Sequence, residues 1–422
     1  MTAVAAVAVV AGFAAAVALA WPAARRTGLA IWHPALAWLA LEATFFGLGS
    51  IVLAVAEGRA GPAWDVAASV VAFGLAVALS GALARRRTSG PPHGPDSTPE
   101  SDDAPDEVRW VAVLGMIAIG IAALVPTLLA VGLPALASDI TGARVAVGGI
   151  ELQPLRVAIP AGLATAAVVA VRTPSRDVRI ATLVWLAVAI AAELALASRY
   201  LAAELAAAIV VALALAGRRL AYRSLVAVGA AALALFVVVG VLRAYGETNG
   251  RPLEFALERS INRVVLIQPR TLDALQEVIP ADVPYFGGLT WVRRLAPLVG
   301  RDDVPNLGYW IYPRMFPDQV TPGYAAPGVL GEAWANFGPL GVVVPAGLGI
   351  LAERLGAWIA FRRRSAADIA TGALAILFLA RTHAVGLTGL AVLAALVIVW
   401  RLLAAPVAGL RGDLARVVTW RA

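Results

Sequence analysis

The sequence predicts an all-α protein: a polytopic integral membrane protein with about 11 transmembrane helices and one long loop on the outer face. Hydrophobic residues make up 60% of the 422 residues and charged residues only 14%. In soluble domains about 45–50% of the residues are hydrophobic and about 25% are charged. Long apolar runs recur along the chain, and arginine is concentrated in alternate connections between them. These observations exclude an ordinary soluble domain.

The apolar runs are long enough for helices that cross a bilayer, which need about 20 residues each. The first run is not a typical signal peptide, because Arg25 and Arg26 follow it and no positively charged region precedes it. The predicted spanning segments are residues 2–21, 29–56, 63–84, 109–135, 150–171, 179–198, 200–217, 224–242, 329–353, 367–383 and 385–404.

The arginines predict the orientation of these segments. Cytoplasmic connections of membrane proteins are rich in Lys and Arg. Here 20 arginines fall in alternate connections and the C-terminal tail, against 5 in the other short connections. The sequence therefore predicts a multi-pass protein of the inner (cytoplasmic) membrane. Its N-terminus is expected outside, its C-terminus in the cytoplasm and its long loop on the outer face.

Three regions follow from this topology. Residues 1–243 are predicted to form an N-terminal transmembrane bundle, and residues 244–328 a large extracytoplasmic loop. Residues 329–422 supply the C-terminal transmembrane helices and a cytoplasmic tail. Within the first region, residues 88–108 are rich in Pro, Ser and acidic residues, which predicts a disordered cytoplasmic linker.

The long loop is the chemically varied part of a chain made mostly of Ala, Val, Leu and Ile, so we look for function there. Apolar residues at helical spacing predict an amphipathic helix over residues 252–267, on or near the membrane surface. A second short helix is predicted to begin near Thr271 and to end at Pro280. Residues 244–327 contain eight arginines and nine acidic residues, so bulk charge does not favour non-specific polyanion binding.

The composition excludes several kinds of chemistry. The chain has no cysteine, which excludes disulfides and thiolate nucleophiles, and its three histidines argue against a His-rich metal centre. All 34 basic residues are arginine, so a P-loop lysine and a Schiff base are excluded as well. We therefore expect no metal, no cofactor and no nucleic-acid partner.

Arginines on the predicted outer side are candidates for binding an anion. Arg259 and Arg263 are four residues apart on one helical face, where like charges repel unless an anion lies between them. A diphosphate suits the planar guanidinium; pairing with Glu254, Glu258 or lipid headgroups is the alternative. Arginines at membrane depth indicate function, although those near helix ends can reach the headgroups instead. Arg144, Arg156, Arg199 and Arg381 are the further candidates, since they lie near helix ends on the predicted outer side.

Three sets of side chains have both a functional and a structural interpretation. His383 lies with Arg381 in a predicted tight outer hinge, where it is either an acid–base group or structural. Glu332 begins an apolar helix, where a carboxylate is either a base or an N-terminal cap. The loop's aromatic residues either anchor the chain at the headgroups or form a platform for sugar rings. The central ones are Tyr309, Trp310, Tyr312 and Phe316, with Trp291 and Trp334.

Short motifs follow one another in a characteristic order. In the first half they are Trp32-His33-Pro34, the segment GLPALASDITGARVAVGGI with Arg144, and Ala197-Ser198-Arg199. In the late loop they are Tyr285-Phe286-Gly287-Gly288, Pro313-Arg314, Phe316-Pro317, Thr321-Pro322-Gly323 and GEAWANFGPLG, followed by Arg381. This layout resembles that of the O-antigen (oligosaccharide repeat-unit, Wzy-type) polymerases, membrane glycosyltransferases of the GT-C class. The resemblance covers most of the chain. The 88–108 linker and the short final helices depart from it.

The resemblance implies glycosyl transfer from a polyprenyl-diphosphate-linked glycan to a lipid-linked repeat unit at the outer leaflet. The implied partners are the lipid-linked oligosaccharide, membrane lipids, and flippase and chain-length regulator proteins. The diphosphate would be held by Arg199, Arg259, Arg263 and Arg381, with Arg144 beside them. The acid–base candidates are Glu332, His383 and Asp318, and the glycan-binding candidates are Tyr309, Trp310, Tyr312 and Arg314.

Other functions are compatible with the same layout. An O-antigen ligase shares the architecture and the chemistry and differs only in its acceptor. A transporter or flippase for lipid-linked glycans is less favoured, because the sequence has no internal repeat and its polar residues gather at one face. A scaffolding protein would leave the long loop and its arginines unexplained.

Overall fold

The structure is a computed structural model, and every described residue outside turns and coil is helical, which confirms the all-α class. The predicted 88–108 linker and Arg144 lie outside the described residues. These are residues 1–87, 110–136, 143, 152–172, 175–196, 199–218, 221–244, 252–293, 296, 298, 300–301, 303–318, 323–362 and 365–404.

Five helices among the described residues are long and apolar enough to cross a membrane, which supports a multi-pass membrane protein. They are Thr2–Arg26, Pro34–Ala56, Gly61–Arg85, Pro154–Arg172 and Gly328–Phe361. The count of eleven spans is not confirmed and stays a prediction. Helix lies over every predicted segment, but α16 (Ala366–Ala380) has only 15 residues and α17 (Thr382–Ala404) is interrupted at Gly386.

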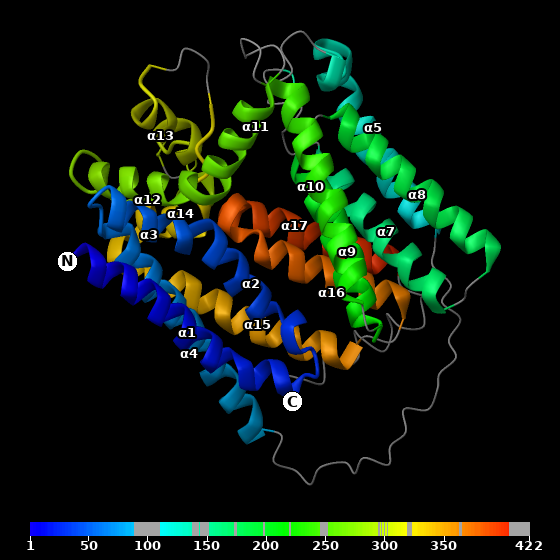
Figure 1. Ribbon diagram of the computed structural model, residues 1–422, viewed down its shortest axis with the longest axis horizontal. Coiled ribbons are helices and arrows are strands. Elements are labelled where there is room, and N and C mark those ends of the chain that lie inside the picture. The colour runs from blue at the N-terminus through cyan, green and yellow to red at the C-terminus, as the bar shows by residue number, and fades with distance from the viewer. Residues whose placement is uncertain are drawn as a thin grey trace. The chain divides into compact units, whose positions relative to one another are not determined.

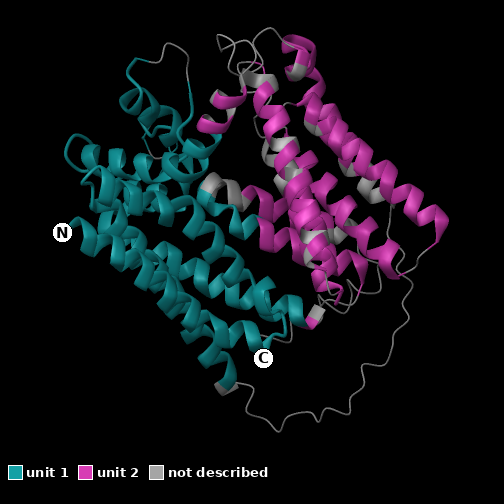
Figure 2. Ribbon diagram, viewed as in Figure 1, with its two compact units in different colours: residues 1–92, 259–360, 378–391 teal, residues 93–258, 361–377, 392–422 magenta. Residues whose placement is uncertain are grey.

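Contacts between residues divide the chain into two units, each built from segments that are distant in sequence (Figure 2). Unit 1 comprises Met1–Pro92, Arg259–Ala360 and Phe378–Ala391. Unit 2 comprises His93–Glu258, Phe361–Leu377 and Val392–Ala422. The three regions predicted from the sequence, which divide at residues 243 and 328, rest on the predicted membrane topology and not on contacts. They stay a prediction.

Unit 1 contains the N-terminal helices and the late loop (Figure 1). Its elements are α1 (Thr2–Arg26), η1 (Ala30–Trp32), α2 (Pro34–Glu42), the π-helix η2 (Ala43–Gly47), α3 (Leu48–Ala56), α4 (Gly61–Arg87), the π-helix η5 (Asn262–Leu266), α12 (Ile267–Val278), α13 (Leu307–Met315), α14 (Gly328–Phe337), the 3-10 helix η7 (Gly338–Val342) and α15 (Val343–Arg362). The turn between α16 and α17 also belongs to this unit.

Helices α1 and α4 pack closely through small residues. A Cβ atom at Gly12 would lie 3.2 Å from Val70, and one at Gly74 would lie 2.7 Å from the Cα of Ala16. Farther along, Arg26 donates to the carbonyl of Gly81 at 2.8 Å. The residue numbers of these contacts increase together in both helices, so α1 and α4 are parallel. A parallel arrangement is expected for the first and third of three successive membrane crossings.

Unit 2 is organised around α7. Its elements are α5 (Trp110–Val131), η3 (Pro134–Leu136), α7 (Gln153–Arg172), α8 (Arg176–Ala195), α9 (Arg199–Leu215), α10 (Tyr222–Ala244) and most of α11 (Pro252–Ile261). Helix α7 packs against α5, α8 and α9. The indole of Trp185 donates to the carbonyl of Ile159 at 3.3 Å and covers Gly162, where a larger side chain would meet the ring.

The structure changes the boundaries predicted for the loop helices. A helix does follow Pro252, as α11. The second helix begins at Ile267 and not near Thr271, because the five residues of η5 continue the helical turns from α11 into α12.

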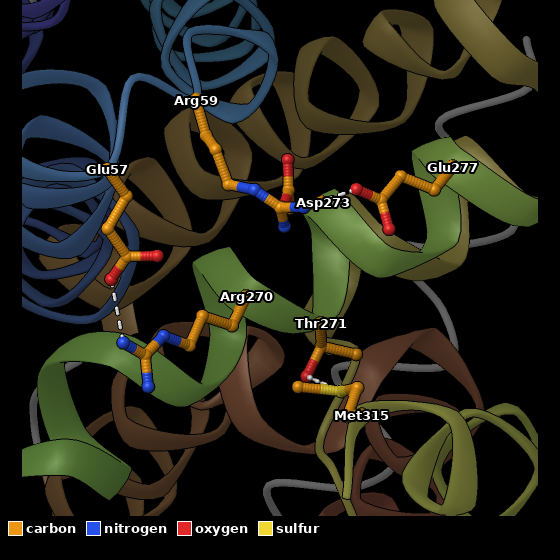
Figure 3. A network of polar contacts seen from close by, with 7 residues as sticks. All are labelled: Glu57, Arg59, Arg270, Thr271, Asp273, Glu277 and Met315. Carbon is orange, nitrogen blue, oxygen red and sulfur yellow. Dashed lines mark hydrogen bonds and ion pairs between the residues drawn. The ribbon is translucent and has the colours of Figure 1, made fainter. Parts of the chain in front are cut away.

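Helix α12 is joined to the α3–α4 connection by ion pairs (Figure 3). Arg59 of the connection pairs with both Asp273 and Glu277 of α12. In the opposite sense, Arg270 of α12 donates to Glu57 at 2.7 Å. The α3–α4 connection and α12 thus each contribute a positive and a negative side chain. Only one position of α12 beside the connection satisfies all of these ion pairs.

Asp273 is the most buried member of this network. Burial raises the pKa of the Asp273 carboxyl, and the Arg59 guanidinium opposes that rise. Beside it, the Thr271 hydroxyl donates to the carbonyl of Ile267 at 2.6 Å and contacts the sulfur of Met315 at 3.6 Å, which links α12 to α13 (Figure 3). Gln276 donates to Asp65 on α4. These contacts join α12 both to the membrane helices and to the loop.

We expect the Arg59–Asp273 pair to stabilise unit 1 measurably. The side chain of Arg59 is 44% exposed and that of Asp273 only 11%, so the pair lies between a surface and a buried ion pair. A double-mutant cycle with R59A and D273A, followed by thermal unfolding in detergent, should give a coupling free energy of about 1 kcal/mol. The exposed Arg301–Asp303 pair is the control and should give a smaller coupling. Equal couplings for the two pairs would contradict this expectation.

Candidate functional site

Three of the candidate residues lie in unit 1 on two segments that contact each other: Glu332 on α14, and Arg381 and His383 at the α16–α17 turn. The Glu332 carboxylate, on α14, accepts a hydrogen bond from the backbone N–H of Leu387 at 2.9 Å. The indole of Trp291 lies beside the same carboxyl. Arg381 and His383 are buried in the turn just before Leu387, at 9% and 3% exposure. The segments that carry the carboxyl, the guanidinium and the imidazole are thus in contact with each other.

The position of Glu332 depends on a break in α17. Gly386 has φ 64° and ψ −169°, outside the helical range and in the left-handed region that favours glycine. A Cβ atom at Gly386 would overlap the Glu332 carboxyl. Leu387 follows the break, so its N–H belongs to the first turn of the resumed helix and needs an acceptor from outside it. Glu332 is therefore a cap, but of α17 and not of its own helix.

His383 is held on two sides. Its ring stacks on Phe45 with centroids 3.9 Å apart and planes at 28°. Its Nδ1 atom contacts the carbonyl of Ala380, which assigns the proton to Nδ1 and leaves Nε2 as an acceptor. The neighbouring Thr382 accepts a hydrogen bond from the indole of Trp38 at 2.8 Å. These contacts orient the imidazole tightly.

The same contacts place the turn against the Pro34–Ala56 helix at Trp38 and at its middle residue Phe45, and not at its end, Ala56. Helix α16, which leads into the turn, has 15 residues and extends about 22 Å, which is shorter than the roughly 30 Å of a bilayer core. The outer position of this turn stays a prediction.

Arg263 is near the segment that leads into α14. Its Nη2 atom donates to the carbonyl of Tyr324 at 3.5 Å, and its side chain is half-buried. Arg263 belongs to the π-helix η5, which packs against the other π-helix, η2. At this contact Gly49 lies so close to the carbonyl of Val265 that no side chain would fit. π-Helical turns are frequent at functional sites.

The run Tyr285–Thr290 is attached to the end of α14, chiefly through Asn336. The N–H groups of Phe286 and Gly287 donate to the carbonyls of Ala335 and Asn336 at 3.1 and 3.0 Å. The Asn336 side chain accepts from the N–H of Gly288 at 2.8 Å and donates to the Thr290 hydroxyl at 2.6 Å. These bonds position Trp291, the next residue, beside Glu332.

The aromatic candidates pack mainly on other residues of the loop. Trp310 meets Phe286 edge-on at 6.5 Å, and the Arg314 guanidinium lies 4.1 Å from the Trp310 ring centroid. Tyr309 meets Tyr324 at 5.1 Å and remains 45% exposed. In addition, Tyr312 contacts Phe316 at 4.9 Å. Exposed surface for a ligand is offered by Tyr309 and Arg314, and by Asp318 in the turn after α13.

The remaining arginine candidates are not brought to this site by the described residues. Arg199 is the first residue of α9, in unit 2, and Arg259 belongs to α11. The side chains of both lie outside the description, as does Arg144 entirely. Arg156 is half-buried on α7. Their contribution to a diphosphate clamp stays a prediction, and Arg263 and Arg381 are the two described in unit 1.

Sequence reasoning missed three polar residues in and around this region. Glu42 and Gln268 are buried, with 1% and 0% exposure, and so is Asn336. Glu42 had a readable signal, because a carboxyl inside an apolar predicted span is costly and indicates function. Gln268 and Asn336 had none, since their burial depends on how the loop folds back onto the helices.

No protein-family model, curated protein or solved structure matches this chain. The resemblance to the repeat-unit polymerases therefore stays a prediction, and the site itself has to support any function.

Gly386 gives a direct test of the site's geometry. Replacing it with alanine strains a left-handed residue and drives a methyl group into the Glu332 carboxyl, so G386A should lower stability by about 1–3 kcal/mol. Gly347 is the matched control, because a Cβ atom there meets nothing within 4 Å. G347A should be neutral or slightly stabilising. Thermal unfolding in detergent checks both. Equal stability of the two variants would contradict the assigned break in α17.

Proposed function

We propose that this protein is a membrane glycosyltransferase that polymerises lipid-linked oligosaccharide repeat units at the outer face of the cytoplasmic membrane. The donor is a glycan on a polyprenyl diphosphate, and the acceptor is a lipid-linked repeat unit. The observation that carries the proposal is the half-buried Glu332 carboxyl, held by the Leu387 N–H on the segment that also carries Arg381 and His383. These residues offer two proton acceptors and a cation, which are what this reaction needs.

The chemistry follows from those groups. A hydroxyl of the acceptor sugar attacks the anomeric carbon of the donor, and the bond between that carbon and the diphosphate oxygen breaks. The hydroxyl proton passes to Glu332 or to Nε2 of His383, which accept in the described geometry. Arginine stabilises the negative charge that develops on the departing diphosphate. Diphosphate is a good leaving group, so no nucleotide is needed.

The arginines divide by position. Arg381 lies in the turn with His383, and Arg263 reaches the segment that leads into α14. We assign diphosphate contact to these two, with Arg199, Arg259 and Arg144 as further contributors. Tyr309, Trp310, Tyr312 and Arg314 are assigned to the glycan. Asp318 is kept as a second base, since its exposed position suits contact with a substrate that arrives from the loop side.

Two other functions remain as alternatives. A ligase would use the same groups and pass the glycan to a different acceptor. A lipid-linked glycan transporter is favoured by one observation, the break of α17 at Gly386 beside buried polar groups, because transporters place their sites at broken helices.

One experiment separates the three functions. The purified protein is incubated with a polyprenyl-diphosphate oligosaccharide in bilayers, and the products are resolved by size. A ladder of lengthening glycans supports the polymerase. A single transfer to another acceptor supports the ligase, and movement between leaflets without new glycosidic bonds supports the transporter.

Glu332 should be needed for chemistry more than for folding. In E332Q the amide oxygen can still accept from the Leu387 N–H, so α17 keeps its cap, but the amide cannot take a proton. We expect E332Q to lose about 10²–10⁴-fold in the rate of ladder formation, the usual contribution of a general base. Its thermal stability should stay close to wild type. Wild-type rates in E332Q would refute the assigned role and leave His383 or Asp318 as the base.

Arg263 should be needed for the diphosphate. R263A is expected to abolish polymer formation while the protein stays folded in detergent, and R199A is expected to do the same. The control is R301A, because Arg301 is paired with its exposed neighbour Asp303 at 2.7 Å, and this variant should keep wild-type activity. Long glycan chains on R263A or R199A would show that the clamp assignment is wrong.

A further inference from the structure

Two buried side chains in unit 1 have two polar atoms each and a hydrogen-bond partner for neither, among the residues that the structure describes. They are Glu42 at the end of α2 and Gln268 on α12, with 1% and 0% exposure. Single atoms of Ser50 and His33 lack a partner as well. Buried polar groups in folded proteins nearly always have one. The fully unsatisfied carboxyl and amide therefore point to something that binds there.

Glu42 belongs to the helical face that contacts the α16–α17 turn. One turn before it, Trp38 donates to Thr382. About one turn after it, Phe45 stacks on His383, and Phe46 lies 3.0 Å from where a Cβ atom of Gly328 would be. Residues spaced by three or four positions share one face of a helix. Glu42 therefore lies on the helix between residues that contact the α16–α17 turn and the start of α14.

Gln268 approaches the same junction from α12. One turn after it, Leu272 is fully buried in a core that also contains Phe46, Val329 and Leu330. Phe46 follows Glu42 by one turn, and Val329 is the second residue of α14. The carboxyl and the amide thus border the place where η2, α12, α14 and the turn meet. Glu332, on α14, borders it as well.

We propose that Glu42 and Gln268 form a sugar-binding subsite inside unit 1 that takes hydroxyl groups of a saccharide. The inference rests on the proposed glycosyl transfer and places one sugar ring of a lipid-linked substrate. A carboxyl group accepts hydrogen bonds from hydroxyls and donates one when it is protonated, and an amide both donates to a hydroxyl oxygen and accepts from a hydroxyl. Each side chain can therefore hold hydroxyl groups of a sugar. The nearby His383, with Nε2 as an acceptor, can then reach a further hydroxyl.

Other ligands fit these groups less well. The described residues contain no group of three His, Asp or Glu side chains that would hold a metal. A phosphate needs several hydrogen-bond donors, and the Glu42 carboxyl offers at most one. Ordered water would satisfy the four atoms too, and it is the alternative that the experiment must exclude.

The subsite is closed to solvent in this state, so a sugar enters only after a local opening. The backbone around the junction suits such a change. Residues 323–327 are non-helical and end at Gly328, whose φ is +59° and which lies against the carbonyl of His383. Gly386 breaks α17 on the other side of the turn. These positions can rearrange without unfolding a helix.

The test compares lipids with and without a sugar. Binding of farnesyl diphosphate, and of farnesyl diphosphate carrying glucose, galactose, mannose or an N-acetylhexosamine, is measured on the purified protein in bilayers. In wild type, at least one sugar should raise the affinity over the sugarless lipid. E42L and Q268L should remove about tenfold or more of that gain, as expected when hydrogen bonds to a charged or amide group are lost. Affinity for farnesyl diphosphate itself should not change.

Stability distinguishes this role from a structural one. Each leucine replaces an unsatisfied buried polar group with an apolar one of similar size, so E42L and Q268L should raise the melting temperature of the ligand-free protein. Glu353 is the matched control, because it is buried in the same unit but accepts a hydrogen bond from Ser80 at 3.1 Å. E353L should lower the melting temperature and leave the sugar-dependent affinity unchanged.

The outcomes separate the subsite from the proposed function. The subsite is refuted if no sugar raises wild-type affinity, or if the variants keep the sugar-dependent gain, as they would if only water occupied it. It is also refuted if E42L and Q268L weaken both lipids equally. If the variants lose the gain but the wild-type protein makes no glycan ladder, the subsite stands and the polymerase proposal fails. If the wild type makes a ladder and both variants keep the gain in affinity, the polymerase proposal stands and the subsite is refuted.

Discussion

The hydrogen bond from the Leu387 N–H to the Glu332 carboxylate is the contact on which the site depends. Where α17 breaks at Gly386, its first amides lose their helical partners, and in an apolar interior such groups need an acceptor. Glu332 supplies one from α14. Arg381 and His383 lie on the segment that leads into this break. One short interaction thus joins α14 to the segment that carries the other two candidate residues.

Two further constraints hold the surroundings in place. Small residues let α1 and α4 approach closely, which builds a rigid base for unit 1. Ion pairs between α12 and the α3–α4 connection, and the bonds of Asn336 to the Tyr285–Thr290 run, then attach the loop to that base. The loop is therefore part of the folded unit, and Trp291 is held at Glu332 as a consequence.

Much of the fold was readable from residue type and spacing. The apolar runs predicted helices at the right places, and Pro252 marked the start of the loop helix. The α12 start was missed because η5 continues the helix without a sequence break. Within the site, Glu332 and His383 stood out as isolated polar residues in apolar surroundings. Glu42 carried the same signal, whereas Gln268 and Asn336 were hidden because nothing local marks a loop amide as buried.

The sequence by itself determined the fold class and the membrane character, because hydrophobicity and its period are properties of each segment alone. It also marked the polar residues that an apolar chain retains at a cost. Only the tertiary structure decided which of them meet. Residue spacing within one segment does not say which helix the α16–α17 turn packs against, or that Glu332 caps a helix 55 residues away along the chain. Those facts depend on long-range packing, in which helix lengths, a glycine break and buried hydrogen bonds must all be satisfied at once.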